Sequence, residues 1–183
     1  MSELRARARG GGGAFGAERV FEAIEATPLY FLTFWMAAAR LILSAAETDA
    51  PPSLVTRMAG NGNVFGLSLA GRPAEWTVVP ADPPRGPYIS QAGADARPTG
   101  AIGDSAVIDA LGFGAQALRF AAEPRESLKG FLPPDWEVPS LRLMSTVHPA
   151  FASLGVRVGL DARRVVDSGC TPLVTLGMVE RTG

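Results

Sequence analysis

The sequence predicts an α+β fold, in which an N-terminal helical segment is followed by a mixed or antiparallel sheet with packed helices. Two stretches near the N-terminus place apolar side chains at helical spacing. Strand-like runs and turn dipeptides follow, and they interleave with helices without the regular period of a doubly wound parallel sheet. The expected boundaries are a flexible leader or linker at residues 1–16, a helical segment at 17–48 and an α+β domain at 49–183.

The composition is that of a globular protein and excludes several classes of function. Apolar residues make up 47% of the 183 residues and charged residues 19%, which is enough apolar sequence for a real core. The formal net charge of −1 gives no basic surplus, so nucleic acid is not expected as a partner. The single cysteine, Cys170, indicates a reducing, cytoplasmic compartment. With His148 as the only histidine, a Cys/His metal cluster is excluded, and we expect no metal or cofactor.

The N-terminal part is predicted to be a leader followed by two helices. Residues 1–16 are basic and then glycine-rich, without the apolar core of a secretion signal. Residues 18–26 place apolar side chains on one helix face, and residues 29–47 form a helix that is apolar nearly all round. Because Arg40 interrupts this run and a membrane span needs about 20 largely uncharged residues, we predict a buried core helix and no membrane contact.

The middle of the chain is predicted to hold strands and then a broken helix. Residues 64–70 and 76–81 are strand candidates, joined by residues 71–75 as a hairpin loop. A helical pattern at 105–122 contains Gly112 and Gly114, and glycine costs about 1 kcal/mol in a helix interior. We therefore expect one helix to end at this point and another to begin.

The C-terminal part is predicted to alternate between strands and a short helix. The helix at 161–169 is expected to be capped by Asp161 and stopped by Gly169. The strand candidates are residues 141–147, 156–160 and 171–180.

The stretch TGAIGDSA, residues 99–106, has the residue types of an anion-binding site. Gly100 and Gly103 would let backbone approach a ligand closely, and Asp104 or Ser105 can cap the helix that follows. Helix N-termini present free N–H groups that attract phosphate or carboxylate. The same residues suit a helix cap at a tightly packed corner, so the residues alone leave both interpretations open.

Two other places could carry chemistry. The turn at Asn61 and Gly62 has amide groups that can hold a planar carbonyl or amide ligand, although asparagine also favours turns by bonding its own backbone. His148 could act as a general base, but the proline after it predicts an extended residue at the end of an element, as a structural histidine would be. Gly112 and Gly114 form only a fragment of a dinucleotide fingerprint.

Several of these segments, taken in order, resemble a known family. They are FLTFWMAAARLILSAAE, SLVTRMAGNGNVFGLSLAG, IGDSAVIDALGFGAQALRFAAEP, HPAF and GLDARRVVDSGCTPLVTLGMVER. Together they are similar to the C-terminal part of a bacterial domain-of-unknown-function family that includes a subunit of oxamate carbamoyltransferase, from anaerobic allantoin degradation. The resemblance extends from about residue 29 to the end and is most specific at residues 58–66 and 102–106.

The resemblance implies transfer of a carbamoyl group between oxalurate and phosphate, which gives oxamate and carbamoyl phosphate. It implies a small anionic substrate, and other subunits or a missing N-terminal half as partners, with self-association as a further alternative. Family members carry a preceding α/β half that this sequence lacks. They also have Glu at the position of Asp109 and a larger residue at the position of Gly60.

If that chemistry is carried over, hydrogen-bond donors must face a tetrahedral oxyanion and anionic substrates. The resemblance then points to Asp104 and His148 as catalytic residues, with Asp104 organising the backbone or accepting a proton from the oxamate nitrogen. The expected substrate-binding residues are Asn61, Gly62, Gly103, Ser105, Gly112 and Gly114. The alternative is a non-catalytic interaction or scaffold domain derived from the same family.

Overall fold

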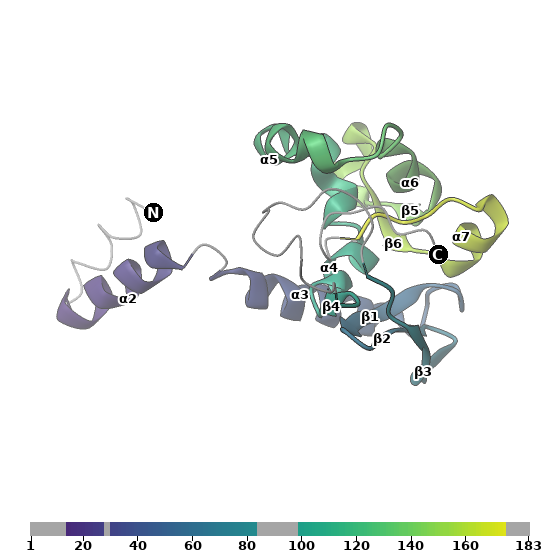
Figure 1. The fold of residues 1–183 in the computed structure, drawn as a ribbon, viewed down its shortest axis with the longest axis horizontal. Helices are drawn as coiled ribbons and strands as arrows, with labels where there is room; N and C mark the ends of the chain where they lie inside the picture. Colours follow the sequence, from purple (N-terminus) through teal and green to yellow (C-terminus); the bar gives the residue numbers. More distant parts are fainter. Residues whose placement is uncertain (1–13, 28–29, 84–98, 175–183) are drawn as a thin grey trace. The chain divides into compact units, whose positions relative to one another are not determined.

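The computed structural model describes residues 14–27, 30–83 and 99–174 of the chain. The chain divides into two compact units, Met1–Trp35 and Met36–Gly183. The first unit holds α2 (Ala14–Ala26) and the start of α3 (Leu32–Ala46) (Figure 1). Helix α2 therefore begins inside the stretch that the sequence assigned to a leader, whose first thirteen residues lie outside the described ones.

Helix α3 packs on one side only, which corrects the prediction of a buried core helix. Its buried side chains are Ala39 and Leu43, four residues apart and therefore on one face. Arg40 is accommodated by an ion pair of 3.1 Å between its Nη1 and Oε1 of Glu47. None of the helices in the described ranges is long and apolar enough to cross a membrane.

Four strands of the second unit form an antiparallel sheet in the order β3-β2-β1-β4 (Figure 1). The predicted hairpin loop at 71–75 is wrong, because Leu69 already pairs with Arg72 and only two residues form the turn. The bounds of the strands are Val55–Asn61 for β1, Val64–Leu69 for β2, Arg72–Pro80 for β3 and Ile102–Gly103 for β4.

A second antiparallel sheet consists of β5 (Met144–Val147) and β6 (Arg157–Leu160). Helix α4 (Ala106–Leu111) contacts both β1 and β6, and all its residues are buried, so it joins the two sheets. The α+β class is therefore confirmed, with two antiparallel sheets rather than one mixed sheet.

Short helices make up most of the remaining C-terminal part. The predicted break at Gly112 and Gly114 is present, since Gly112 has a φ of 100° and ends α4. The bounds are Ala115–Phe120 for η1, Ala122–Leu128 for α5, Lys129–Phe131 for η2, Glu137–Arg142 for α6, Pro149–Leu154 for η3 and Ala162–Ser168 for α7.

The predicted ends of α7 are confirmed, but the last predicted strand is not. Oδ1 of Asp161 accepts a hydrogen bond of 3.0 Å from the backbone N–H of Arg163, and Gly169 ends the helix with a φ of 61°. Residues 171–174 form no strand, because the Leu173 carbonyl accepts from the Gln116 side chain instead of from a neighbouring strand. The rest of that prediction lies outside the described residues.

Candidate functional site

The two predicted turns lie side by side in the second unit. Strand β4 pairs with the end of β1, so Gly60 stands opposite Gly103 and Asn61 stands opposite Ile102. The N–H of Gly62 donates a hydrogen bond of 3.0 Å to the Ala101 carbonyl. The fold thus brings Asn61, Gly62 and Gly103 together, although they come from separate parts of the chain. We call residues 60–63 and 100–105 the corner.

The corner is packed backbone against backbone. A Cβ atom on Gly60 would meet the carbonyl oxygen of Ala101, and one on Gly100 would meet the carbonyl oxygens of Ala81 and Gly62. The corner therefore leaves no room for the larger residue that the family resemblance implies at Gly60. Tight packing alone accounts for Gly60 and Gly100.

The Asn61 side chain shapes the turn and also leaves a donor exposed. Its Oδ1 accepts hydrogen bonds from the N–H groups of Asn63 and Val64, at 3.0 and 2.9 Å. These bonds are the ones by which asparagine stabilises a turn. In the part of the chain that the structure describes, the Nδ2 group of this exposed residue has no partner. One edge of the amide holds the hairpin, and the other edge is available.

Asp104 and Ser105 begin α4 without capping it by their side chains, which corrects that expectation. Ser105 occupies the N-cap position with helical angles of −60° and −16°, whereas a capping side chain normally needs extended backbone. The backbone carbonyls of Asp104 and Ser105 accept from the N–H groups of Val107 and Ile108 at 3.2 and 2.9 Å. The Asp104 side chain is exposed and that of Ser105 is half-buried.

His148 lies at the other end of α4 from Asp104. Its Nδ1 accepts a hydrogen bond of 3.2 Å from the N–H of Ala150, which caps η3. Its ring centroid is 4.9 Å from that of Phe151 and 6.1 Å from that of Phe113. Phe113, which neighbours His148, follows the last turn of α4, whereas Asp104 precedes its first turn. The two predicted catalytic residues, Asp104 and His148, are therefore separated by the length of α4, about 9 Å.

Gly112 and Gly114 have packing roles at this far end of α4. A Cβ atom on Gly112 would lie 3.1 Å from both the Arg157 carbonyl oxygen and Sδ of Met144. A Cβ atom on Gly114 would clash with the carboxyl group of Asp109, which packs against the Gly114 backbone. Both glycines therefore allow α4 and η1 to approach their neighbours closely.

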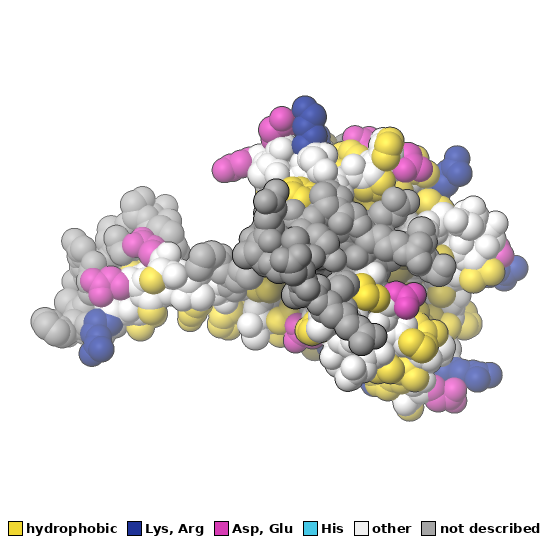
Figure 2. Space-filling view, viewed as in Figure 1, with side chains coloured by type: hydrophobic (Ala, Val, Ile, Leu, Met, Phe, Trp, Pro, Cys, Tyr) yellow, Lys and Arg dark blue, Asp and Glu magenta, His cyan; other side chains and the backbone are white. Residues whose placement is uncertain are grey.

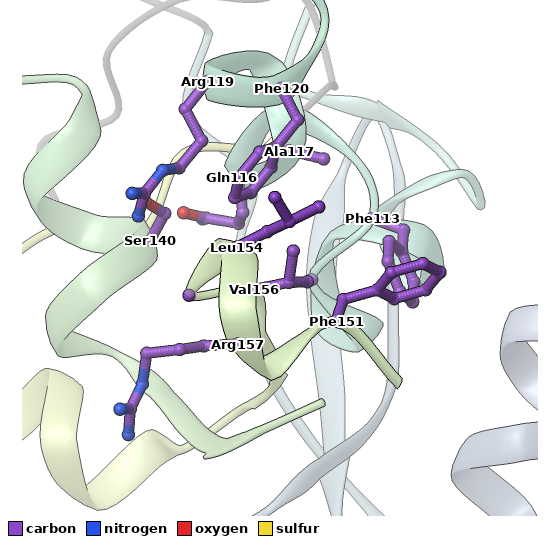
Figure 3. A pocket seen from close by; sticks show the side chains of 12 residues that line it. Phe113, Gln116, Ala117, Arg119, Phe120, Ser140, Phe151, Leu154, Val156 and Arg157 are labelled. Atoms are coloured by element: carbon purple, nitrogen blue, oxygen red, sulfur yellow. The ribbon is translucent and has the colours of Figure 1, made fainter. Parts of the chain in front are cut away.

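A cavity of about 230 Å³ opens beside this break (Figure 3). Its walls are mainly apolar, and the guanidinium of Arg119 lies over the Phe120 ring, 4.9 Å from the centroid. The residues that line it are Gly112, Phe113, Gln116, Ala117, Arg119, Phe120, Ser140, Phe151, Leu154, Gly155, Val156 and Arg157.

The polar side chains around the cavity are largely engaged in holding the fold. Nε2 of the buried Gln116 donates to the Leu173 carbonyl at 3.0 Å, and Arg157 donates to the Met144 carbonyl at 3.2 and 3.3 Å. Oε1 of Gln116 has no partner among the described residues. Sequence reasoning missed these residues, because they come from separated segments, and only the nearby glycine pair marks the place.

No group of three metal-binding side chains occurs within the described ranges. The arrangement offers hydrogen-bond donors at the corner and an apolar hollow at the other end of α4.

Comparisons with known proteins show the family. The family model described as oxamate carbamoyltransferase subunit AllG matches residues 8–105, which include the whole corner. The oxamate carbamoyltransferase subunit AllG of Escherichia coli K12 is 30% identical over 175 residues, which cover 88% of this chain and 40% of that protein. The uncharacterized protein YahG of the same organism is 28% identical over 181 residues, covering 88% of this chain and 36% of its own length.

A solved structure shares the fold. The crystal structure of a conserved protein of unknown function from Enterococcus faecalis V583 matches with a TM-score of 0.71 and 23% sequence identity. The match covers 89% of this chain and 42% of that one, so the chain spans about two fifths of the length of the proteins it matches. The chain belongs to the AllG family of oxamate carbamoyltransferase subunits.

Proposed function

We propose that this chain is a subunit or half-domain of a carbamoyltransferase of the oxamate type, with an active site shared with another domain or chain. The reaction transfers the carbamoyl group of oxalurate to phosphate, which gives oxamate and carbamoyl phosphate. In the reverse direction, oxamate takes the carbamoyl group from carbamoyl phosphate. The observation that carries the proposal is that the family match includes both turns of the corner, which β1 and β4 place side by side.

The corner supplies donors to the anionic groups of the substrates. In this proposal the exposed amide of Asn61 and the half-buried hydroxyl of Ser105 donate to the carbamoyl oxygen, where negative charge develops in the tetrahedral intermediate. Gly62 and Gly103 let the backbone lie close to the ligand. When oxamate attacks carbamoyl phosphate, its nitrogen forms the new C–N bond, the C–O bond to phosphate breaks, and Asp104 accepts the proton that the nitrogen loses.

The charges at the corner mean that cations for the substrates must come from outside it. The substrates carry carboxylate and phosphate groups, which proteins hold with arginine or lysine. Residues 60–63 and 100–105 contain neither, and their one charged side chain is the acidic Asp104. In this proposal the cations that neutralise the substrates come from outside the corner, and the second domain or chain supplies them to the shared site.

Gly112, Gly114 and His148 lie at the other end of α4. In this proposal they support the site through α4 and η1, and the corner holds the reacting groups. His148 acts there through its packing against Phe113 and Phe151.

The test is formation of carbamoyl phosphate from oxalurate and phosphate, with the chain and its partner subunits. Asn61→Asp keeps the oxygen that holds the turn but replaces the amide donor with a negative oxygen. We expect a loss of activity of about 100-fold, in the range of a lost oxyanion donor. Asn63→Asp, which adds the same charge within the same turn, is the matched control. Equal activity in the two variants, or full activity without this chain, would contradict the proposal.

The second candidate is a non-catalytic scaffold domain. It is favoured by the positions of Asp104 and His148 at opposite ends of α4 and by the packing roles of the corner glycines. A scaffold would be needed for assembly of the complex, yet Asn61→Asp and Asp104→Asn would leave its turnover unchanged. Measuring assembly and turnover of the same variants separates the two functions.

A further inference from the structure

We propose that one face of α3 is a docking surface for the part of the AllG-family fold that lies outside the region matched by this chain. The face consists of Ala38, Leu41, Ile42 and Ala45, and we call it the outer face. These residues follow the helical spacing i, i+3, i+4, i+7 and form one stripe. The inference rests on the family membership and deepens the proposed function, because it places the contact with the second part of a shared site.

The outer face is apolar, and its two large side chains are exposed. Leu41 is 72% exposed and Ile42 is 53% exposed, and Figure 2 shows hydrophobic side chains on the surface along α3. The opposite face already packs within the chain through Ala39 and Leu43. A surface helix of a globular protein normally turns polar side chains to water on the face away from its core. This helix has an apolar face there, which predicts a second packing partner.

Arg40 and Ser44 of α3 do not make the outer face polar. Arg40 pairs with Glu47 at 3.1 Å, and Oγ of Ser44 donates to the Arg40 carbonyl at 2.8 Å. Both groups are engaged locally, and neither position belongs to the stripe. The occupant must therefore offer an apolar surface of its own.

The lengths of the relatives identify the occupant. This chain covers only 36 to 42% of the two E. coli proteins and of the solved structure from Enterococcus faecalis. More than half of each of these proteins thus lies outside the region that this chain matches. A lipid surface would require lysines or arginines beside the apolar stripe, and the only basic residue of α3 is already paired with Glu47.

The test compares this chain with full-length E. coli AllG. Leu41→Lys and Ile42→Lys in this chain should leave its unfolding temperature unchanged, because the face is exposed. Lysine at the aligned positions of full-length E. coli AllG should lower its unfolding temperature by roughly 5 °C or more, because the face would be buried there. The matched control places lysine at Val166, an 80% exposed residue on α7, and at its aligned position. The control substitution should leave the unfolding temperature unchanged in both proteins.

Two outcomes would overturn the inference. One is an unchanged unfolding temperature in the AllG variants. The other is a dimeric mass of this chain by light scattering that Leu41→Lys reduces to the monomer, since a second copy would then cover the face. Neither measurement uses catalytic activity. A failure of the carbamoyl phosphate assay would therefore leave this inference standing, and the reverse also holds.

Discussion

The carboxyl group of Asp109 accepts a buried hydrogen bond of 2.7 Å from the backbone N–H of Ala115, across the break between α4 and η1. Asp109 is 1% exposed, so the bond is out of reach of solvent. The bond is possible because Gly114 has no side chain, since a Cβ atom there would lie 2.7 Å from Cγ of Asp109. This buried hydrogen bond makes the Gly-Phe-Gly segment, residues 112–114, a joint that sets the direction of η1.

Asp109→Ala should destabilise the protein by about 1–3 kcal/mol, because it leaves the buried Ala115 N–H without its acceptor. Asp109→Asn retains an acceptor oxygen and should be milder. Urea unfolding followed by circular dichroism measures both. Asp135→Ala, which removes an exposed carboxylate, is the control and should stay within about 0.5 kcal/mol. An Asp109→Ala protein that unfolds like the wild type would show that the joint is not held by this bond.

Gly114→Ala should cost about 1–3 kcal/mol through overpacking against Asp109. Gly130→Ala is the control, because a Cβ atom at Gly130 meets nothing within 4 Å. The double variant Asp109→Ala with Gly114→Ala removes the group that the new methyl strikes. Its destabilisation should therefore be smaller than the sum of the two single effects. If the two single effects simply add in the double variant, the destabilisation by Gly114→Ala does not come from the contact with Asp109.

Local signals in the sequence were sufficient for the ends of short elements. Asp161 and Gly169 bound α7 because capping depends on residues within one helical turn. Asn61-Gly62 forms a turn for the same reason, since its bonds reach only to Asn63 and Val64. The pair at Gly112 and Gly114 likewise breaks the helical pattern where expected.

Contacts between distant segments could not be predicted in this way. The all-round apolar pattern of α3 predicted burial, but the pattern does not say which chain covers each face. The pairing of Gly60 with Gly103 depends on β4 returning to β1, which no local spacing encodes. Gln116, Ser140 and Arg157 meet around one cavity only through tertiary packing. The candidate site was therefore predictable as two turns and not as one corner.

Gly112→Ala and Gly155→Ala should differ, although both glycines have positive φ angles, of 100° and 65°. Left-handed backbone costs other residues roughly 1–2 kcal/mol, and both variants should show this strain. A Cβ atom at Gly155 meets nothing within 4 Å, whereas at Gly112 it lies 3.1 Å from the Arg157 carbonyl oxygen. Gly112→Ala should therefore be the more destabilising variant in urea unfolding. Equal effects would mean that β6 can move away from α4 without cost.

Asp161→Ala should destabilise the protein by about 1 kcal/mol, because the side chain caps α7 through its 3.0 Å bond from the Arg163 N–H. The same carboxylate also lies 3.6 Å from Nε of Arg164, so a lost ion pair is the competing explanation. Asp161→Asn separates the two, since it keeps a capping oxygen and removes the charge. We expect thermal unfolding of Asp161→Asn to stay close to the wild type, because ion pairs near the surface contribute little. If Asp161→Asn were as unstable as Asp161→Ala, the charge rather than the cap would hold the start of α7.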